Sequence, residues 1–194
     1  MNLPTQITLS RFVIAFAAMA LLFLPGWQGK AGALGCFAVA SLTDWLDGFL
    51  ARRWNQMSPL GALLDPIADK VLVLGMFLAF VQLNLIPAWM VLIIVLRESL
   101  ITGVRLYAAS RQLVLAAAKE GKQKTVSQMV TILLILTLLV AEALVGRDPS
   151  HAEVWRLLDR TVLVSLWVTM VLTVVSGAVF FWRHRSVLRD TVGR

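Results

Sequence analysis

Four aspartates lie close together in one short part of this sequence. Residues 44–69 read DWLDGFLARRWNQMSPLGALLDPIAD, and this window holds four of the chain's 11 acidic residues. Carboxylate oxygens are the ligands that hard divalent cations such as Mg²⁺ and Mn²⁺ prefer, and no His or Cys lies nearby to favour zinc. Four carboxylates can hold two such ions, and paired ions suit phosphoryl transfer. The window therefore predicts a two-metal site for a substrate that contains a diphosphate.

The acidic residues follow a helical spacing, so each pair falls on one face of a helix. The pairs are Asp44 with Asp47, three residues apart, and Asp65 with Asp69, four residues apart. Gly48, Ala51 and Gly61 share these faces, and such small residues let a ligand approach the backbone closely. Arg52 lies one turn beyond Gly48. We expect the two acidic faces to converge, with Arg52 beside the bound diphosphate.

The elements around this window are long and apolar. Hydrophobic residues make up 59% of the 194 residues, whereas a soluble domain is closer to half apolar. Several stretches approach the length that a bilayer-spanning helix needs. They lie at about residues 12–25, 31–43, 71–96, 125–146 and 161–182. The composition predicts an integral membrane protein, and a soluble all-helical bundle is the alternative.

Turn signals divide the chain into six expected helices within a single domain, residues 1–194. We expect them at about 11–25, 31 to beyond 52, 59–82, 88–112, 125–145 and 154–182. A turn is expected over 25–30 and a basic loop over 116–124. The predicted fold class is an all-α integral membrane protein with six transmembrane helices and a short N-terminal interfacial helix. The single cysteine, Cys36, excludes an internal disulfide and is expected in the core.

The positions of the basic residues predict the orientation in the membrane. Six spans place both termini on one side, and all but four of the 18 Lys and Arg residues fall on that side. The four exceptions are Lys30, Arg147, Arg156 and Arg160. By the positive-inside rule, both termini and the acidic window face the cytoplasm. This distribution explains the net charge of +7, and no nucleic-acid partner is expected because no aromatic residues are interleaved with the basic ones.

The acidic window resembles the signature of the CDP-alcohol phosphotransferase family, D-x2-D-G-x2-A-R-x8-G-x3-D-x3-D. All eight fixed positions of that signature are occupied by the expected residue types. They are Asp44, Asp47, Gly48, Ala51, Arg52, Gly61, Asp65 and Asp69. The expected helix count and the chain length are also similar to those of the family, so the resemblance covers essentially the whole chain.

The resemblance implies an enzyme that joins a CDP-linked lipid to an alcohol and releases CMP. It also implies a homodimer in a bacterial-type inner (plasma) membrane, with the site open to the cytoplasmic leaflet. The implied cofactor is Mg²⁺ or Mn²⁺, as two ions held by Asp44, Asp47, Asp65 and Asp69. Asp69 is also implied as the general base for the acceptor hydroxyl. The implied CDP-lipid-binding positions are Asp44, Gly48, Ala51, Arg52 and Gly61.

A second, basic stretch bears on the identity of the acceptor alcohol. Residues 105–128 read RLYAASRQLVLAAAKEGKQKTVSQ and resemble the subfamily that makes phosphatidylglycerophosphate, as does the opening NLPTQITLSR. Basic side chains here could hold a phosphorylated acceptor, since Arg grips phosphate through two hydrogen bonds. The candidates are Arg105, Arg111, Lys122 and Lys124. The implied reaction transfers the phosphatidyl group of CDP-diacylglycerol to glycerol 3-phosphate.

Other interpretations stay open at this point. Basic cytoplasmic loops also fix topology and touch anionic lipids. The neighbouring Arg97 and Glu98, inside the fourth expected helix, could form a structural ion pair or line the route of the acceptor. Within the family, the acceptor could be inositol phosphate, serine or phosphatidylglycerol. Outside it, the acids could be the transit site of a divalent-cation transporter, or the chain could be an inactive membrane scaffold.

Overall fold

The computed structural model describes the backbone of residues 3–54, 59–111 and 119–185, and the side chains of residues 10–43, 70–111 and 123–185. These ranges contain helices and no β-strand. The elements are α1 (Leu3–Phe23), α2 (Trp27–Trp54), α3 (Pro59–Gln82), α4 (Ala88–Ser110), α5 (Lys119–Val145), the short 3-10 helix η1 (Pro149–His151) and α6 (Ala152–Arg183). The prediction of an all-α fold with six long helices is confirmed for the described part of the chain.

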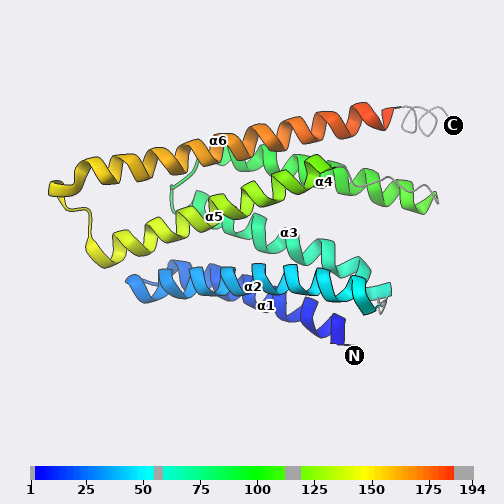
Figure 1. Ribbon diagram of the computed structural model, residues 1–194, viewed down its shortest axis with the longest axis horizontal. Helices are drawn as coiled ribbons and strands as arrows, with labels where there is room; N and C mark the ends of the chain where they lie inside the picture. The colour runs from blue at the N-terminus through cyan, green and yellow to red at the C-terminus, as the bar shows by residue number, and fades with distance from the viewer. Residues whose placement is uncertain (1–2, 55–58, 112–118, 186–194) are drawn as a thin grey trace.

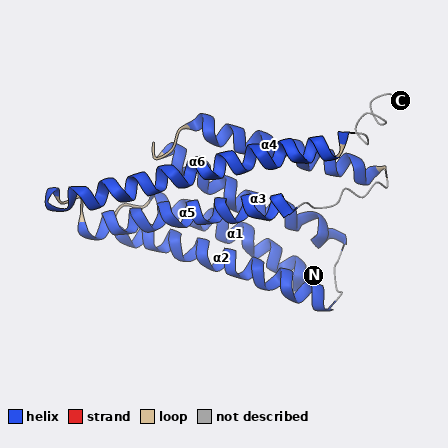
Figure 2. Cartoon of the chain, turned by 45° about the horizontal axis from the view of Figure 1, so that its top comes forward, coloured by secondary structure: helices blue, strands red, loops and turns tan. Residues whose placement is uncertain are grey.

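The long helices alternate in direction along one axis, as Figure 1 shows and Figure 2 repeats from a second direction. The start of α1, the end of α2, the start of α3 and the end of α6 share one end of the bundle. Helix α1 packs against both α2 and α3, and α6 packs against both α4 and α5, while α5 also contacts α2. The two helices that contain the acidic window therefore adjoin at the end where the chain enters and leaves the bundle.

Short turns with left-handed residues reverse the chain at the other end. Gly26 has φ +84° before α2, and Asn84 has φ +56° before α4. Both positions lie in turns that the sequence predicts, and a positive φ suits glycine and asparagine better than other residues. Pro87 then precedes α4 with an extended backbone, because its ring cannot continue a helix from the preceding turn.

Three predicted boundaries were wrong. The expected turn over 25–30 is shorter, because the chain reverses over residues 24–26, with Gly26 at positive φ, and α2 begins at Trp27. The expected basic loop over 116–124 is helical from Lys119, because lysine, glutamate and glutamine are good helix formers. The expected N-terminal interfacial helix is not a separate element: α1 is continuous, and Pro4 lies in its first turn, where proline is tolerated.

The core lies between α1, α2, α3 and α5, with α5 packed against α2 and α3. Large side chains such as Phe37, Phe77 and Leu136 are fully buried there. Glycines allow α1 to approach its neighbours closely: a Cβ added at Gly29 would lie 2.6 Å from a backbone oxygen of α1, and one at Gly75 would lie 2.7 Å from a sulfur on α1. Small residues at helix contacts are typical of membrane proteins, where close packing replaces the hydrophobic effect between helices.

Many large apolar side chains point outward, as expected for helices that face lipid rather than water. Within the described residues, two helical segments are long and apolar enough to cross a bilayer: Gln123–Val145 and Pro149–Arg183. Shorter apolar helical segments span Ser10–Phe23 and Lys70–Gln82. These findings agree with a membrane protein, whereas six complete spans stay a prediction.

Candidate active site

The acidic window forms the adjoining parts of α2 and α3. Asp44 and Asp47 belong to α2, and Asp65 and Asp69 belong to α3, in segments that are helical up to Trp54 and from Pro59 onward. The predicted spacings therefore hold along the backbone, which places each pair on one face of its helix. The side chains of residues 44–69 lie outside the described residues, so the metal-binding and CDP-lipid-binding assignments there stay predictions.

The four aspartates lie at matching heights along the two helices. The last residue of α2 and the first residue of α3 are joined by five peptide units, which span at most about 18 Å. With a rise of about 1.5 Å per residue, Asp44 and Asp69 each lie about 15 Å from these helix ends. Asp47 and Asp65 lie about 10 Å and about 9 Å from them. Because the helices run in opposite directions and these two helix ends lie at the same end of the bundle (Figure 1), the acidic positions of both helices lie at similar distances from that end.

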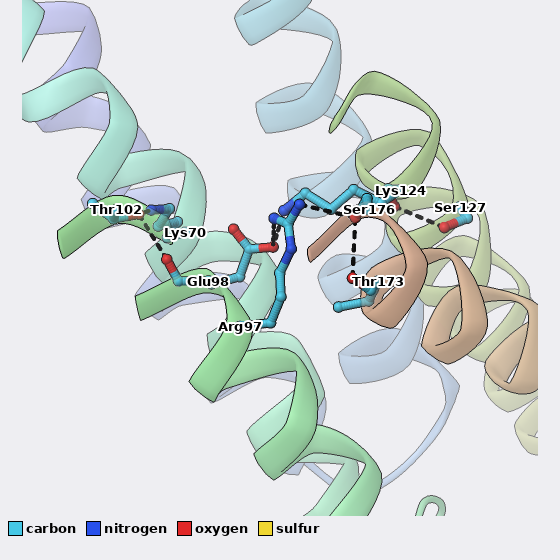
Figure 3. A network of polar contacts seen from close by, with 8 residues as sticks. All are labelled: Lys70, Arg97, Glu98, Thr102, Lys124, Ser127, Thr173 and Ser176. Carbon is cyan, nitrogen blue, oxygen red and sulfur yellow. Dashed lines mark hydrogen bonds and ion pairs between the residues drawn. The ribbon is translucent and has the colours of Figure 1, made fainter. Parts of the chain in front are cut away.

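A polar network begins one residue beyond the acidic window, as Figure 3 shows. Lys70 follows Asp69 in α3, and its ammonium group donates a hydrogen bond to the hydroxyl oxygen of Thr102 on α4. The hydroxyl of Thr102 in turn donates to the backbone oxygen of Glu98 at 2.7 Å. The network thus starts beside the acidic window and crosses from α3 to α4.

Glu98 is the acidic centre of this network. Its carboxylate oxygen Oε1 accepts a hydrogen bond from Nη1 of Arg97 at 3.0 Å and forms an ion pair with Nζ of Lys124 on α5. Nη2 of Arg97 also donates to the hydroxyl oxygen of Ser176 on α6 at 2.8 Å. Glu98 and Lys124 are each only 7% exposed, and an unpaired charge at such a position would cost several kcal/mol. Of the two interpretations of Arg97 and Glu98, the structure shows the ion pair.

Among the described side chains of this network, basic groups outnumber acidic ones. Arg97 and Lys124 contribute two positive charges, and Glu98 contributes one negative charge, so the group as a whole is cationic. Among the residues whose side chains are described, no group of three His, Cys, Asp or Glu side chains could hold a metal ion. The surplus of basic groups among the described residues suits an anion, and the metal site stays a prediction for the acidic window.

The other candidate residues for the acceptor phosphate occupy different surroundings. The guanidinium carbon of Arg105 lies 5.5 Å from the centre of the Phe180 ring on α6. Arg111 is exposed at the end of α4, and its guanidinium carbon lies 5.7 Å from the ring of Tyr107 on its own helix. The side chain of Lys122 lies outside the described residues. The structure therefore brings Arg105 to α6 and Lys124 to Glu98, and leaves Arg111 at the surface.

Sequence reasoning missed a buried polar stripe on α6. Thr169, Thr173 and Ser176 follow at intervals of four and three residues and are almost inaccessible to solvent. The hydroxyl of Thr169 lies 2.9 Å from that of Thr131 on α5. The signal was present in the sequence, because polar residues at helical spacing within an apolar segment indicate a face that packs inside the bundle.

Comparison with known proteins gives an independent result. Residues 1–175 match the sequence model of the CDP-alcohol phosphatidyltransferase family. The chain is 35% identical over 203 aligned residues to a protein of Bacillus subtilis (strain 168) named CDP-diacylglycerol–glycerol-3-phosphate 3-phosphatidyltransferase, covering 98% of both chains. It is 40% identical over 141 residues to a protein of the same name from Escherichia coli (strain K12), covering 70% of this chain and 76% of that relative.

Proposed function

Because this chain belongs to the CDP-alcohol phosphatidyltransferase family, we propose that it transfers the phosphatidyl group of CDP-diacylglycerol to glycerol 3-phosphate, releasing phosphatidylglycerophosphate and CMP. The observation that carries this proposal is the cationic network of Arg97 and Lys124, buried around Glu98 and linked through Thr102 to the residue next to the acidic window. A phosphorylated acceptor needs such a cationic site close to the reacting diphosphate, and the names of the relatives favour glycerol 3-phosphate among such acceptors.

The chemistry of the acidic window supports divalent metal ions as cofactors. Four carboxylates at matching heights on two antiparallel helices form an oxygen-only ligand set, which suits Mg²⁺ or Mn²⁺. Asp44, Asp47, Asp65 and Asp69 would hold two ions, because four carboxylates can supply two sites. When bound, such ions neutralise charge on the diphosphate and on the departing CMP phosphate.

The residues of this chain would bind and orient the two substrates. Gly48, Ala51 and Gly61 leave room for the CDP group near the helix backbones, and Arg52 can donate to its phosphates. The acceptor oxygen forms a bond to the phosphorus that bears the diacylglycerol, and that phosphorus loses its bond to the bridging oxygen, which leaves with CMP. Asp69 would take the proton of the acceptor hydroxyl.

The acceptor phosphate would lie on the side of the site formed by α4, α5 and α6. Lys124 on α5 is held there by Glu98 on α4, and the guanidinium group of Arg105 on α4 lies over the ring of Phe180 on α6. We include Lys122 and Arg111 as residues that attract the acceptor at the end of the bundle. Two fixed cations near one phosphate provide both affinity and orientation, because the charge-assisted hydrogen bonds are short and directional.

The same proposal extends to the arrangement in the membrane. Six transmembrane helices, with both ends of the chain and the acidic window at the cytoplasmic face, agree with the alternating helix directions in Figure 1 and with the distribution of basic residues. The protein would act in a bacterial-type inner membrane, where both CDP-diacylglycerol and a water-soluble phosphate can reach the site. We further propose a homodimer.

The decisive experiment offers labelled acceptors to the purified protein with CDP-diacylglycerol and either Mg²⁺ or Mn²⁺. We expect label from glycerol 3-phosphate to enter lipid, with one CMP released for each molecule incorporated. Inositol phosphate, serine and phosphatidylglycerol serve as competing acceptors in parallel reactions. Chelation of divalent ions with EDTA should stop CMP release, and added Mg²⁺ should restore it.

Two results would contradict this proposal. Incorporation of another acceptor in preference to glycerol 3-phosphate would support the proposed type of reaction but contradict the proposed acceptor and product. Full turnover after chelation would remove the role assigned to the acidic window.

A further inference from the structure

Three buried polar side-chain atoms near the α5–α6 interface, two nitrogens and one oxygen, have no hydrogen-bond partner among the described residues. They are Nε of Arg97, Nε2 of Gln128 and Oγ1 of Thr173. Five buried side-chain atoms in the described part of the chain share this property, and the other two belong to α1 and α2. Leaving a buried polar group unsatisfied costs about 1–3 kcal/mol, so three such groups in one region suggest a ligand that the protein binds there.

The register of α5 and α6 places Gln128 and Thr173 at similar heights along the two helices. The contact between the hydroxyls of Thr131 and Thr169 fixes the register of these two antiparallel helices. Gln128 lies three residues before Thr131 on α5, and Thr173 lies four residues after Thr169 on α6. These steps correspond to rises of about 4.5 Å and about 6 Å in the same direction. The two side chains are 3% and 0% exposed, so both face the interior of the bundle.

Arg97 brings the third group to the same turn of α6. Its Nη2 donates to Ser176, three residues beyond Thr173. A Cβ added at Gly177 would lie 3.7 Å from Nε of Arg97 and 3.2 Å from its Cγ, so the glycine provides the space that the arginine side chain occupies. The guanidinium group therefore rests against the helical turn that begins at Thr173 (Figure 3).

The hydroxyl of Thr173 differs from those of several other Ser and Thr residues in these helices. In apolar helices, a Ser or Thr hydroxyl commonly donates to a backbone oxygen three or four residues earlier. Seven described side chains make this bond: Thr43, Thr102, Ser110, Ser127, Thr161, Ser165 and Ser176. Within the described residues Thr173 makes no such bond, so its hydroxyl remains available to a group outside its own helix.

We propose that Gln128 and Thr173 determine acceptor specificity by binding the hydroxyl of glycerol 3-phosphate that does not react. This inference rests on the proposed function. Glycerol 3-phosphate has two hydroxyls, of which one attacks and one is retained in the product. The retained hydroxyl can accept a hydrogen bond from the amide of Gln128 and donate one to the oxygen of Thr173. The Nε–H of Arg97 faces the phosphate of the same molecule.

The test compares glycerol 3-phosphate with 3-hydroxypropyl phosphate, which keeps the phosphate and a primary hydroxyl but lacks the middle hydroxyl. Wild-type kcat/KM should be at least about 100-fold higher for glycerol 3-phosphate, because a site built to bind a hydroxyl rejects an analogue without it. Thr173→Val and Gln128→Leu should each reduce this ratio at least about tenfold. The KM for CDP-diacylglycerol should not change, and Thr173→Ser should preserve the ratio.

Thr169→Val provides the matched control, because the hydroxyl of Thr169 is already bonded to Thr131. This variant should preserve the ratio between the two acceptors. The inference is overturned if Thr173→Val leaves the ratio unchanged. That result is also expected if a buried water, and not the acceptor, binds the three unsatisfied groups. An equal loss of kcat/KM for both acceptors would likewise overturn it. Thr173→Val nearly preserves side-chain volume, so it decides the question even if Gln128→Leu does not fold.

The assay of the wild-type enzyme separates this inference from the proposed function. Incorporation of glycerol 3-phosphate without discrimination between the two acceptors supports the proposed function and overturns the specificity role. Incorporation of neither acceptor overturns both.

Discussion

Two clusters of charged side chains lie in different parts of the helical bundle and differ in their exposure to solvent. In the first, Glu98 pairs with Arg97 and Lys124, and all three side chains are at most 12% exposed. This cluster joins three helices beside the acidic window. Each of its charges depends on the others, since removal of one partner would leave an uncompensated charge in the interior.

In the second cluster, Arg147 binds Glu142 at 3.0 Å and Asp159 at 2.9 Å between the end of α5 and the start of α6. The arginine side chain is 46% exposed. The hydrogen bond to Asp159 raises the pKa of Arg147 above its ordinary value, and the hydrogen bond to Glu142 adds a smaller increase. Exposed pairs contribute at most about 1 kcal/mol and are screened by salt. Of these two clusters, the first costs free energy because its charges are removed from water. Such a cost is expected at a functional site.

The largest expected effect concerns the acidic window beside the first cluster. Asp65→Asn or Asp69→Asn should reduce CMP release at least about 100-fold, because each removes a charged ligand from the proposed metal site. Asp159→Asn in the second cluster is the matched control and should retain wild-type turnover. Turnover is measured with purified protein, and folding is checked by size-exclusion chromatography in detergent. Normal turnover in either window variant would refute the assigned site.

The next effect tests whether the buried charges depend on one another. Glu98→Gln should lower the free energy of unfolding by about 3–5 kcal/mol, because Arg97 and Lys124 would lose their counter-charge. Adding Lys124→Met should recover part of this loss. Unfolding of the two single variants and the double variant in detergent gives the coupling energy, which we expect to be about 1–3 kcal/mol. Additive losses would show that the ion pair does not stabilise the fold.

A smaller effect distinguishes two residues at the acceptor side. Arg105→Ala should raise the KM for glycerol 3-phosphate about tenfold, equivalent to about 1.4 kcal/mol, since Arg105 is placed against α6 by Phe180. Arg111→Ala should raise it no more than about threefold, because Arg111 is exposed and screened. Initial rates over a range of both substrates provide the measurement. An equal increase in the KM for CDP-diacylglycerol would indicate a general structural role for Arg105.

The smallest effect concerns the second cluster itself. Asp159→Asn should change the free energy of unfolding by less than about 1 kcal/mol, and the change should shrink in about 1 M salt. Thermal unfolding at low and high ionic strength measures both quantities. A larger change that persists at high salt would mean that this cluster is as strongly coupled as the buried one.

Much of the architecture was predictable from local patterns. The six helices, the turns at Gly26 and Asn84, and the helical placement of the acidic pairs follow from apolar periodicity and from the conformational preferences of glycine, asparagine and proline. The missed boundaries at Trp27 and Lys119 are positions where polar residues with adequate helix propensity extend a helix beyond its apolar part.

The residues of the acidic window were identifiable from sequence because their spacing is short and lies within single helices. The pairing of Glu98 with Lys124 and the unsatisfied polar groups of Gln128 and Thr173 were not, although each residue is visible in the printed chain. Lys124 and Thr173 lie far from Glu98 and Gln128 in sequence, and only the packing of α4, α5 and α6 decides which side chains meet. Helical periodicity determines which residues share a face of one helix, whereas the register between helices depends on how all their side chains fit together.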